Sequence, residues 1–234
     1  MKTSNMKRTY HHGDLKNALI EAALAHIARD GARALSLREV ARSAGVSHTA
    51  SYRHFRSKES LLAAIAEQGF HRLSDMMRVA IQQHSNDPPA MLRASGVAYV
   101  EFGVRYPDHL QIMFSGLIGR HDDYPELKTA GQEAYELLAS SVRAAMQAGL
   151  VRGPSEDIVS LTAWALVHGL ALLIAGGQVD RDSKESFSAA DLAFQVTGLL
   201  QQGIAMVPTR GARKSTPSAN RKRSTRSYSG RASR

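Results

Sequence analysis

Side chains that can bind phosphates or the edges of nucleobases gather in one short stretch near the N-terminus. They are His48, Thr49, Tyr52, Arg53 and, five residues further on, Lys58. If the first four lie on one helix, they project from its N-terminal half and outer face, where no core needs them. Hydroxyl, imidazole and basic groups on an exposed helix face suit contacts with a nucleic-acid backbone and with base edges.

The preceding residues predict a second short helix packed against this one. Its apolar positions follow the i, i+3, i+4, i+7 spacing: Leu37, Val40, Ala41 and Ala44. Ser36 and Glu39 have the spacing of a capping box, and Gly45 suits the end of the helix. Ser47 is a good N-cap for the next helix, which runs to about His54. Two such helices joined by a glycine turn predict a helix-turn-helix, whose second helix enters the major groove.

Two further helices frame this pair. A helix over 14–30, ended by Gly31, turns apolar residues inward at every fourth position. A longer helix runs from Ser57, its N-cap, to about Gln83. Lys58 falls in its first turn, where free backbone N–H groups also attract a phosphate.

The stretch resembles the DNA-binding domain of the TetR/AcrR transcriptional regulators. The matching residues are SLREVARSAGVS (36–47), YRHF (52–55) and Ser57–Lys58–Glu59 with the two leucines that follow. Ser51 differs, because the family often has a small apolar residue or proline there. The resemblance implies DNA contacts by Arg38, His48, Thr49, Tyr52, His54 and Lys58, and we add Ser47 and Arg53 as candidates.

Charge is distributed unevenly along the 234 residues. Residues 1–65 carry 11 basic and 5 acidic side chains, residues 66–207 carry 10 and 16, and residues 208–234 carry 9 and none. A basic segment that contains the motif points to a phosphate backbone as its partner. The acidic segment 66–207 is repelled by DNA, which orients the basic segment 1–65 toward the duplex.

Composition excludes several other classes of protein. The chain is 43% hydrophobic and 22% charged, as in soluble globular proteins, and it has no cysteine for a disulfide, a thiol nucleophile or a cysteine zinc site. The polar N-terminus has no signal segment, and the longest apolar run, 161–177, is interrupted by His168 and short for a membrane span. We expect a cytoplasmic protein without cofactor or bound metal.

The patterns predict an all-α fold without strands. We divide it into a flexible basic arm (1–12), a helix-turn-helix domain (13–73, with the motif at 36–55), a helical ligand-binding and dimerisation domain (74–207) and a disordered basic tail (208–234). The long helix from Ser57 joins the two domains. Further helices are expected over 90–106, 107–114, 125–148, 155–174 and 188–206.

The helix over 155–174 is apolar nearly all round, so we expect a core on one side and a second subunit on the other. Its WALVHG run (164–169) resembles the WHG-type C-terminal domain of some TetR regulators. Trp164 and His168 share a face, either as packed core with a hydrogen-bonded histidine or as the wall of a ligand pocket. The dimer candidates are Leu161, Leu172, Val196, Leu199, Leu200 and Ile204. The pocket candidates are Phe70, Met76, Met77, Phe102, Met113, Phe114, Tyr135, Trp164 and His168.

The leading hypothesis is a homodimeric repressor that a small apolar or amphipathic ligand releases from double-stranded DNA. One helix-turn-helix reads few base pairs, so two copies on a pseudo-palindromic operator are expected. One alternative is a ligand-independent or architectural DNA-binding protein that works through its basic tail. Another is a helical enzyme, but no paired carboxylates in an apolar setting, no phosphate loop and no catalytic triad pattern occur in the sequence.

Overall fold

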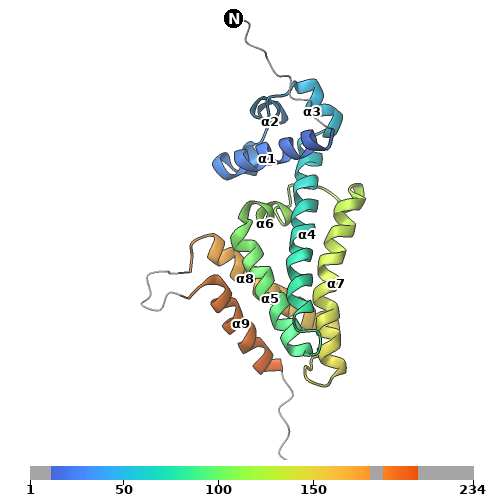
Figure 1. The fold of residues 1–234 in the computed structure, drawn as a ribbon, viewed down its shortest axis with the longest axis vertical. Helices are drawn as coiled ribbons and strands as arrows, with labels where there is room; N and C mark the ends of the chain where they lie inside the picture. Colours follow the sequence, from blue (N-terminus) through green and yellow to red (C-terminus); the bar gives the residue numbers. More distant parts are fainter. Residues whose placement is uncertain (1–11, 180–186, 205–234) are drawn as a thin grey trace, which may run out of the picture.

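A computed structural model describes residues 12–179 and 187–204 (Figure 1). These residues form helices joined by turns, without a β-strand, as the sequence predicts. The helices are α1 (His12–Asp30), α2 (Leu37–Ser43), α3 (His48–His54), α4 (Lys58–Gln82), α5 (Pro88–Arg105), α6 (Pro107–Met113), α7 (Pro125–Gln147), α8 (Glu156–Ala175) and α9 (Ala189–Ile204). Short 3-10 helices, Ala32–Ala34 and His121–Asp123, lie in the connections before α2 and α7.

Helices α1 to α3 and the start of α4 form a head, whose buried apolar side chains are continuous with those of the body. Gly45 adopts a left-handed φ of 69°, and the N–H of Val46 donates to the carbonyl of Ala41, as in a Schellman C-cap. The predicted capping box at Ser36 is wrong, because its side chain makes no cap hydrogen bond. The first turn of α2 is exposed at Arg38 and Glu39, so water can satisfy its N–H groups instead.

Helix α4 runs from the head into the body and belongs to both (Figure 1). The Ser57 hydroxyl accepts from the N–H of Ser60, and the Ser60 hydroxyl accepts from the N–H of Ser57, so a reciprocal capping box closes the start of α4. Inside the body, α4 lies beside α5 and α7. A movement of α4 relative to the body therefore moves the head.

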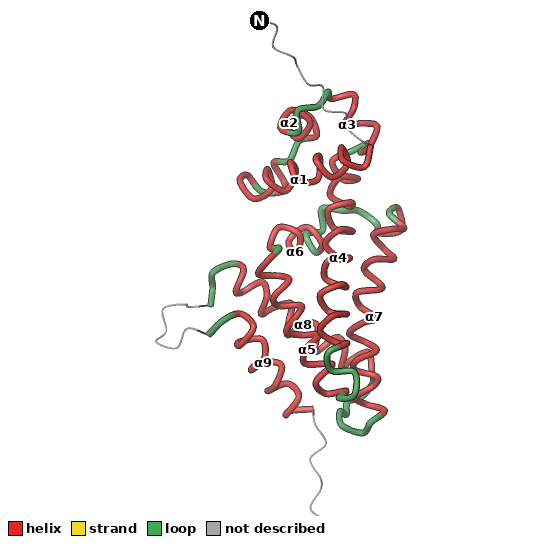
Figure 2. Tube along the Cα trace, in the orientation of Figure 1, coloured by secondary structure: helices red, strands yellow, loops and turns green. Residues whose placement is uncertain are grey.

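The body consists of α5 to α9 around the lower part of α4 (Figure 2). Helix α5 approaches α8 and α9 closely because it carries glycines at the contacts. A Cβ on Gly96 would lie 2.9 Å from a methyl carbon of Thr197, and one on Gly103 would lie 2.8 Å from Ala171. These glycines let α5 act as the centre of the body.

Several expectations lie outside the described residues or are not tested by the fold. The arm apart from His12, and the whole tail over 208–234, are outside the described ranges.

Helix α8 is long and apolar enough to cross a membrane by length and composition, which the shorter run 161–177 did not indicate. It packs against α5, α7 and α9, and an apolar core helix of a soluble protein can have the same length and composition.

Candidate DNA-binding surface and ligand cavity

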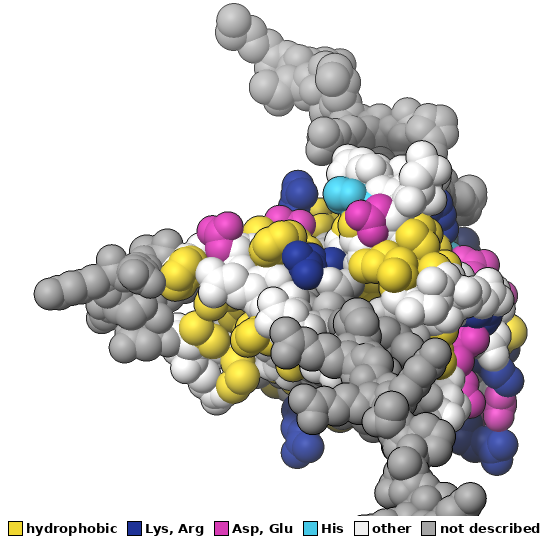
Figure 3. Space-filling model, turned by 90° about the horizontal axis from the view of Figure 1, so that it is seen from below, with side chains coloured by type: hydrophobic (Ala, Val, Ile, Leu, Met, Phe, Trp, Pro, Cys, Tyr) yellow, Lys and Arg dark blue, Asp and Glu magenta, His cyan; other side chains and the backbone are white. Residues whose placement is uncertain are grey.

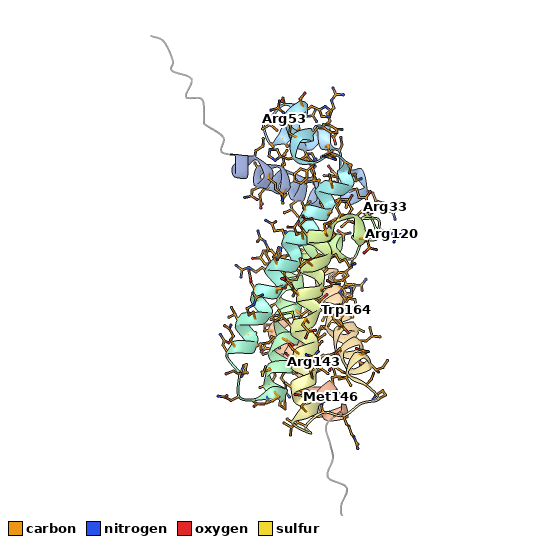
Figure 4. The ribbon with its side chains drawn as sticks, turned by 90° about the vertical axis from the view of Figure 1, so that its right-hand side faces the viewer. Arg33, Arg53, Arg120, Arg143, Met146 and Trp164 are labelled. Atoms are coloured by element: carbon orange, nitrogen blue, oxygen red, sulfur yellow. The ribbon has the colours of Figure 1, made fainter. Side chains whose placement is uncertain are left out.

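The outer face of α3 is polar and exposed. Four of its side chains are exposed to solvent: His48, Thr49, Tyr52 and Arg53. The ring centres of His48 and Tyr52 lie 4.6 Å apart, in an edge-to-face arrangement. Arg53 lies near the top of the head, well away from Trp164 in the body (Figure 4). This surface is free to enter a groove of DNA.

The inner side of α3 is anchored to the head. Ser51 and Phe55 are buried, at 0% and 3% exposure. The Ser51 hydroxyl donates to the carbonyl of His48 at 2.7 Å, so the departure from the family pattern leaves no unsatisfied polar group. Ser47 caps the helix by accepting from the N–H of Ala50, as predicted.

The remaining DNA-binding candidates flank α3. Arg38 is exposed and lines a hollow beside His48 at the start of the helix. His54 is half-buried at the end of α3. Lys58 is half-buried too, and its ammonium donates to the carbonyl of Arg33 at 2.7 Å. That contact, which the sequence did not indicate, ties the start of α4 to the connection between α1 and α2.

The body contains a mainly apolar cavity of about 580 Å³ between α4, α5, α7, α8 and α9. Five of the nine pocket candidates line it: Phe70, Met77, Phe114, Tyr135 and Trp164. Its polar lining includes three charged residues, Arg93, Lys128 and Glu136, none of which we singled out from the sequence. A cavity of this size suits a small organic molecule.

Four other pocket candidates lie away from the lining. Phe102 is fully buried in the core, and Met113 fills the contact between α6 and α4 beside Gly69. Met76 is half-buried outside the cavity, and His168 lies behind its wall. Helical spacing indicates an inward face, but it does not indicate which inward side chains border empty space.

Tyr99, which the sequence analysis missed, connects His168 to the cavity. Its hydroxyl lies 2.9 Å from Nδ1 of His168 and accepts from Nε1 of Trp164 at 3.4 Å. Burial raises the pKa of Tyr99 to about 12, and burial also lowers the pKa of His168. Both groups are therefore neutral at pH 7, as a hydrogen-bonded pair in an apolar wall requires.

The outer face of α8 and α9 exposes large apolar side chains. Leu161, Leu172 and Leu199 are 50%, 46% and 67% exposed, and Phe194, which we did not predict, is 54% exposed. In Figure 3 hydrophobic side chains gather on the left, the side on which α8 and α9 lie in Figure 1. The other dimer candidates are placed differently: Val196 is half-buried, Leu200 lines the cavity, and the side chain of Ile204 lies outside the described residues.

The short acidic segment after α6 forms ion pairs with basic side chains near it. Asp122 lies 2.7 Å from the ammonium of Lys128 and 3.4 Å from the guanidinium of Arg120. Among the side chains that the structure describes (15–120, 122–179 and 187–203), no three histidine or acidic residues come together in a way that could hold a metal ion.

Comparison with known families agrees with this architecture. Residues 19–65, which include α2 and α3, match the family model described as bacterial regulatory proteins, tetR family. Residues 92–192 match the model described as tetracyclin repressor-like, C-terminal domain. The narrower resemblance of WALVHG to WHG-type domains stays a prediction.

Solved structures share the fold over most of the chain. A protein of unknown function from Rhodococcus sp. RHA1 is 31% identical, with a TM-score of 0.72 over 86% of this chain and 100% of that one. The TetR family transcriptional regulator PfmR from Thermus thermophilus is 19% identical, with a TM-score of 0.63 over 79% and 97%. FadR from Bacillus subtilis, solved with stearoyl-CoA, is 16% identical, with a TM-score of 0.66 over 80% and 98%. The present chain belongs to the TetR family of bacterial transcriptional regulators, which bind DNA through a helix-turn-helix.

Proposed function

We propose that the protein is a homodimeric, cytoplasmic repressor without catalytic activity, released from its operator by a small apolar or amphipathic molecule. The observation that carries the proposal is the cavity of about 580 Å³ beside α4, the helix that also supports the head. A ligand that fits one position of α4 better than another shifts the position of the head. Two heads held by one dimer then lose the spacing that a pseudo-palindrome requires.

The proposed DNA contacts divide into two kinds. His48 and Thr49, at the N-terminal end of α3, would read base edges, and Arg53 would add a contact from the same exposed face. Arg38, Tyr52 and Lys58 would hold the phosphate backbone; Tyr52 lies a turn beyond the N-terminal residues of α3 that point deepest into the groove. Lys58 keeps two further donors for a phosphate besides the one directed at Arg33.

The exposed apolar face of α8 and α9 supports the homodimer. Leu161, Leu172, Phe194 and Leu199 would meet the same residues of a second copy, giving a four-helix contact. Burying this face removes large apolar side chains from water, which is the main driving force of association.

The experiment compares operator affinity with and without compounds that bind the body. Trp164 is the only tryptophan and lines the cavity, so its fluorescence reports occupancy directly. A compound that changes this fluorescence should weaken operator binding by a coupling free energy of about 1–3 kcal/mol. Compounds that fill the cavity and leave operator affinity unchanged would argue for a ligand-independent repressor.

Removing residues 208–234 separates the repressor from an architectural protein. A repressor keeps its preference for the operator over unrelated DNA, because the preference comes from α3. A protein that acts mainly through the tail loses most of its DNA binding with those residues.

A further inference from the structure

We propose that the cavity binds an amphipathic ligand that carries a negatively charged group, and that Arg93 binds this group. The inference rests on the proposed ligand-binding function and adds the chemical class of the ligand. It depends on how the charges that line the cavity are paired.

Two of the three charged lining residues already have partners of opposite charge. The ammonium of Lys128 lies 2.7 Å from Asp122, and Glu136 lies 3.1 Å from the guanidinium of Arg143. Arg143 also pairs with Glu156 at 2.7 Å, so this group of three carries a net negative charge. Asp122 is shared with Arg120, at 3.4 Å, so Lys128 is only partly neutralised, but Lys128 and Glu136 each already have a partner of opposite charge.

Arg93 differs because no acidic side chain among the described residues pairs with it. Its Nε donates to the amide oxygen of Gln201 at 2.9 Å, and its guanidinium lies 4.6 Å from the centre of the Phe194 ring. The amide nitrogen of Gln201 in turn donates to the carbonyl of Pro89. These contacts fix the orientation of the guanidinium and leave its two terminal nitrogens without a described hydrogen bond.

A half-buried guanidinium that is oriented but not neutralised favours an anion. Its planar array of N–H groups matches a carboxylate or phosphate better than a neutral group. The hydroxyls of Ser95 and Thr197 nearby donate to backbone carbonyls of their own helices, at 2.8 and 2.6 Å. The rest of the lining, including Leu73, is largely apolar and suits a hydrocarbon or aromatic body.

Ligands of one chain length and three charges test the proposal. Full-length protein is titrated with decanoate, 1-decanol and decylamine at pH 7.5, and Trp164 fluorescence is followed, with calorimetry as a second readout. Decanoate should bind at least about tenfold more tightly than the other two, the usual effect of hydrogen bonds to a charged group. Arg93→Met should remove this preference and change the affinity for 1-decanol less than about twofold, because that ligand needs no ion pair.

Two other variants distinguish the effect of the Arg93 charge on binding from a general effect of the substitution on the fold. Gln201→Leu should lose part of the preference, because Gln201 orients the guanidinium. Arg72→Met is the matched control and should keep it, since Arg72 stacks on Tyr106 at 5.0 Å and does not line the cavity. All variants should keep the dimer and operator binding of the parent.

The results that would contradict the anion site differ from those that would contradict the ligand-binding function. Equal binding of decanoate and 1-decanol, or equal loss of both in Arg93→Met, would overturn the anion site and leave the ligand-binding function intact. Dissociation of the dimer in Arg93→Met would place the guanidinium in the subunit interface and overturn the proposal as well. If none of the three compounds binds, the proposed anion site is wrong, whereas the ligand-binding function is tested separately by the effect of cavity-filling compounds on operator affinity.

Discussion

The backbone N–H of Gly119 donates a 2.7 Å hydrogen bond to the carboxylate of Glu59, sixty residues earlier in the chain. Glu59 lies in the first turn of α4, directly after the helix-turn-helix, whereas Gly119 belongs to the loop between α6 and α7. The same loop begins with Phe114, which lines the cavity. The contact therefore joins the body to the start of α4.

Replacing Glu59 with alanine should lower the free energy of unfolding by about 1 kcal/mol, because the hydrogen bond is partly exposed to water. The measurement is urea unfolding followed by circular dichroism. Glu133→Ala is a control on an exposed residue of α7, and it should unfold like the parent. A Glu59→Ala protein as stable as the parent would show that the contact does not hold the head to the body.

Variants in α3 should separate base reading from phosphate binding. Thr49→Ala or His48→Ala should change the preferred base at one position of each half-site and cost about 1–3 kcal/mol against the native operator. Tyr52→Phe keeps the ring contact with His48 and loses a phosphate hydrogen bond, so affinity should fall evenly across operator variants. An altered base preference in Tyr52→Phe would mean that Tyr52 reads sequence.

Lys58→Met should weaken binding to all DNA sequences alike and reduce the slope of log affinity against log salt by about 1. The same change removes the hydrogen bond to Arg33, so thermal unfolding must be measured alongside. A reduced melting temperature with an unchanged salt slope would assign Lys58 a structural role only.

Leu199→Glu should dissociate the dimer, because Leu199 is 67% exposed in the single chain and lies on the proposed interface. Sedimentation at micromolar concentration measures the effect. Val79→Glu is the matched control, since Val79 is 56% exposed but belongs to α4, and it should stay dimeric. If the Leu199→Glu protein is still a dimer, the interface lies elsewhere.

His109 should make the fold sensitive to acid. Burial, with a smaller effect from the nearby Arg72 charge, lowers the pKa of His109 from 6.5 to about 4. Between these values the unfolded chain binds more protons than the folded one, so stability falls as the pH drops from 6.5 toward 4. The slope from this group is at most about 1.4 kcal/mol per pH unit.

His109→Gln removes the titrating ring that contacts Gln68 and keeps a polar side chain, so it should flatten that dependence when urea unfolding is compared at pH 6.5 and pH 4.5. The exposed residue His71 provides the control, and His71→Gln should keep the slope of the parent. An identical slope in His109→Gln would mean that other groups cause the acid sensitivity.

Local signals in the sequence were sufficient for the helices. Gly45, Pro107, Pro125 and Gly149 lie at or beside the helix ends, because glycine adopts a left-handed φ and proline lacks an N–H donor. The capping box at Ser36 has the right spacing and still does not form, since an exposed helix start does not depend on it. Boundaries follow from local chemistry, whereas individual cap contacts depend on what surrounds them.

Contacts between distant helices could not be predicted in the same way. Leu199 and Leu200 are neighbours in α9, yet one is exposed and the other lines the cavity. The side toward which each points depends on how α9 crosses α5, and helical periodicity does not set that angle. For the same reason the sequence did not indicate that Arg93 meets Gln201, 108 residues later.

The most direct test of the account is a binding-site selection from random double-stranded DNA with the purified full-length protein. The account predicts one enriched motif made of two inverted half-sites at a fixed spacing, bound by one dimer. A Thr49→Ala protein should select a motif that differs at one position of each half-site. Selection of unrelated sequences, or of a single half-site without a symmetric partner, would contradict a dimeric, sequence-specific regulator.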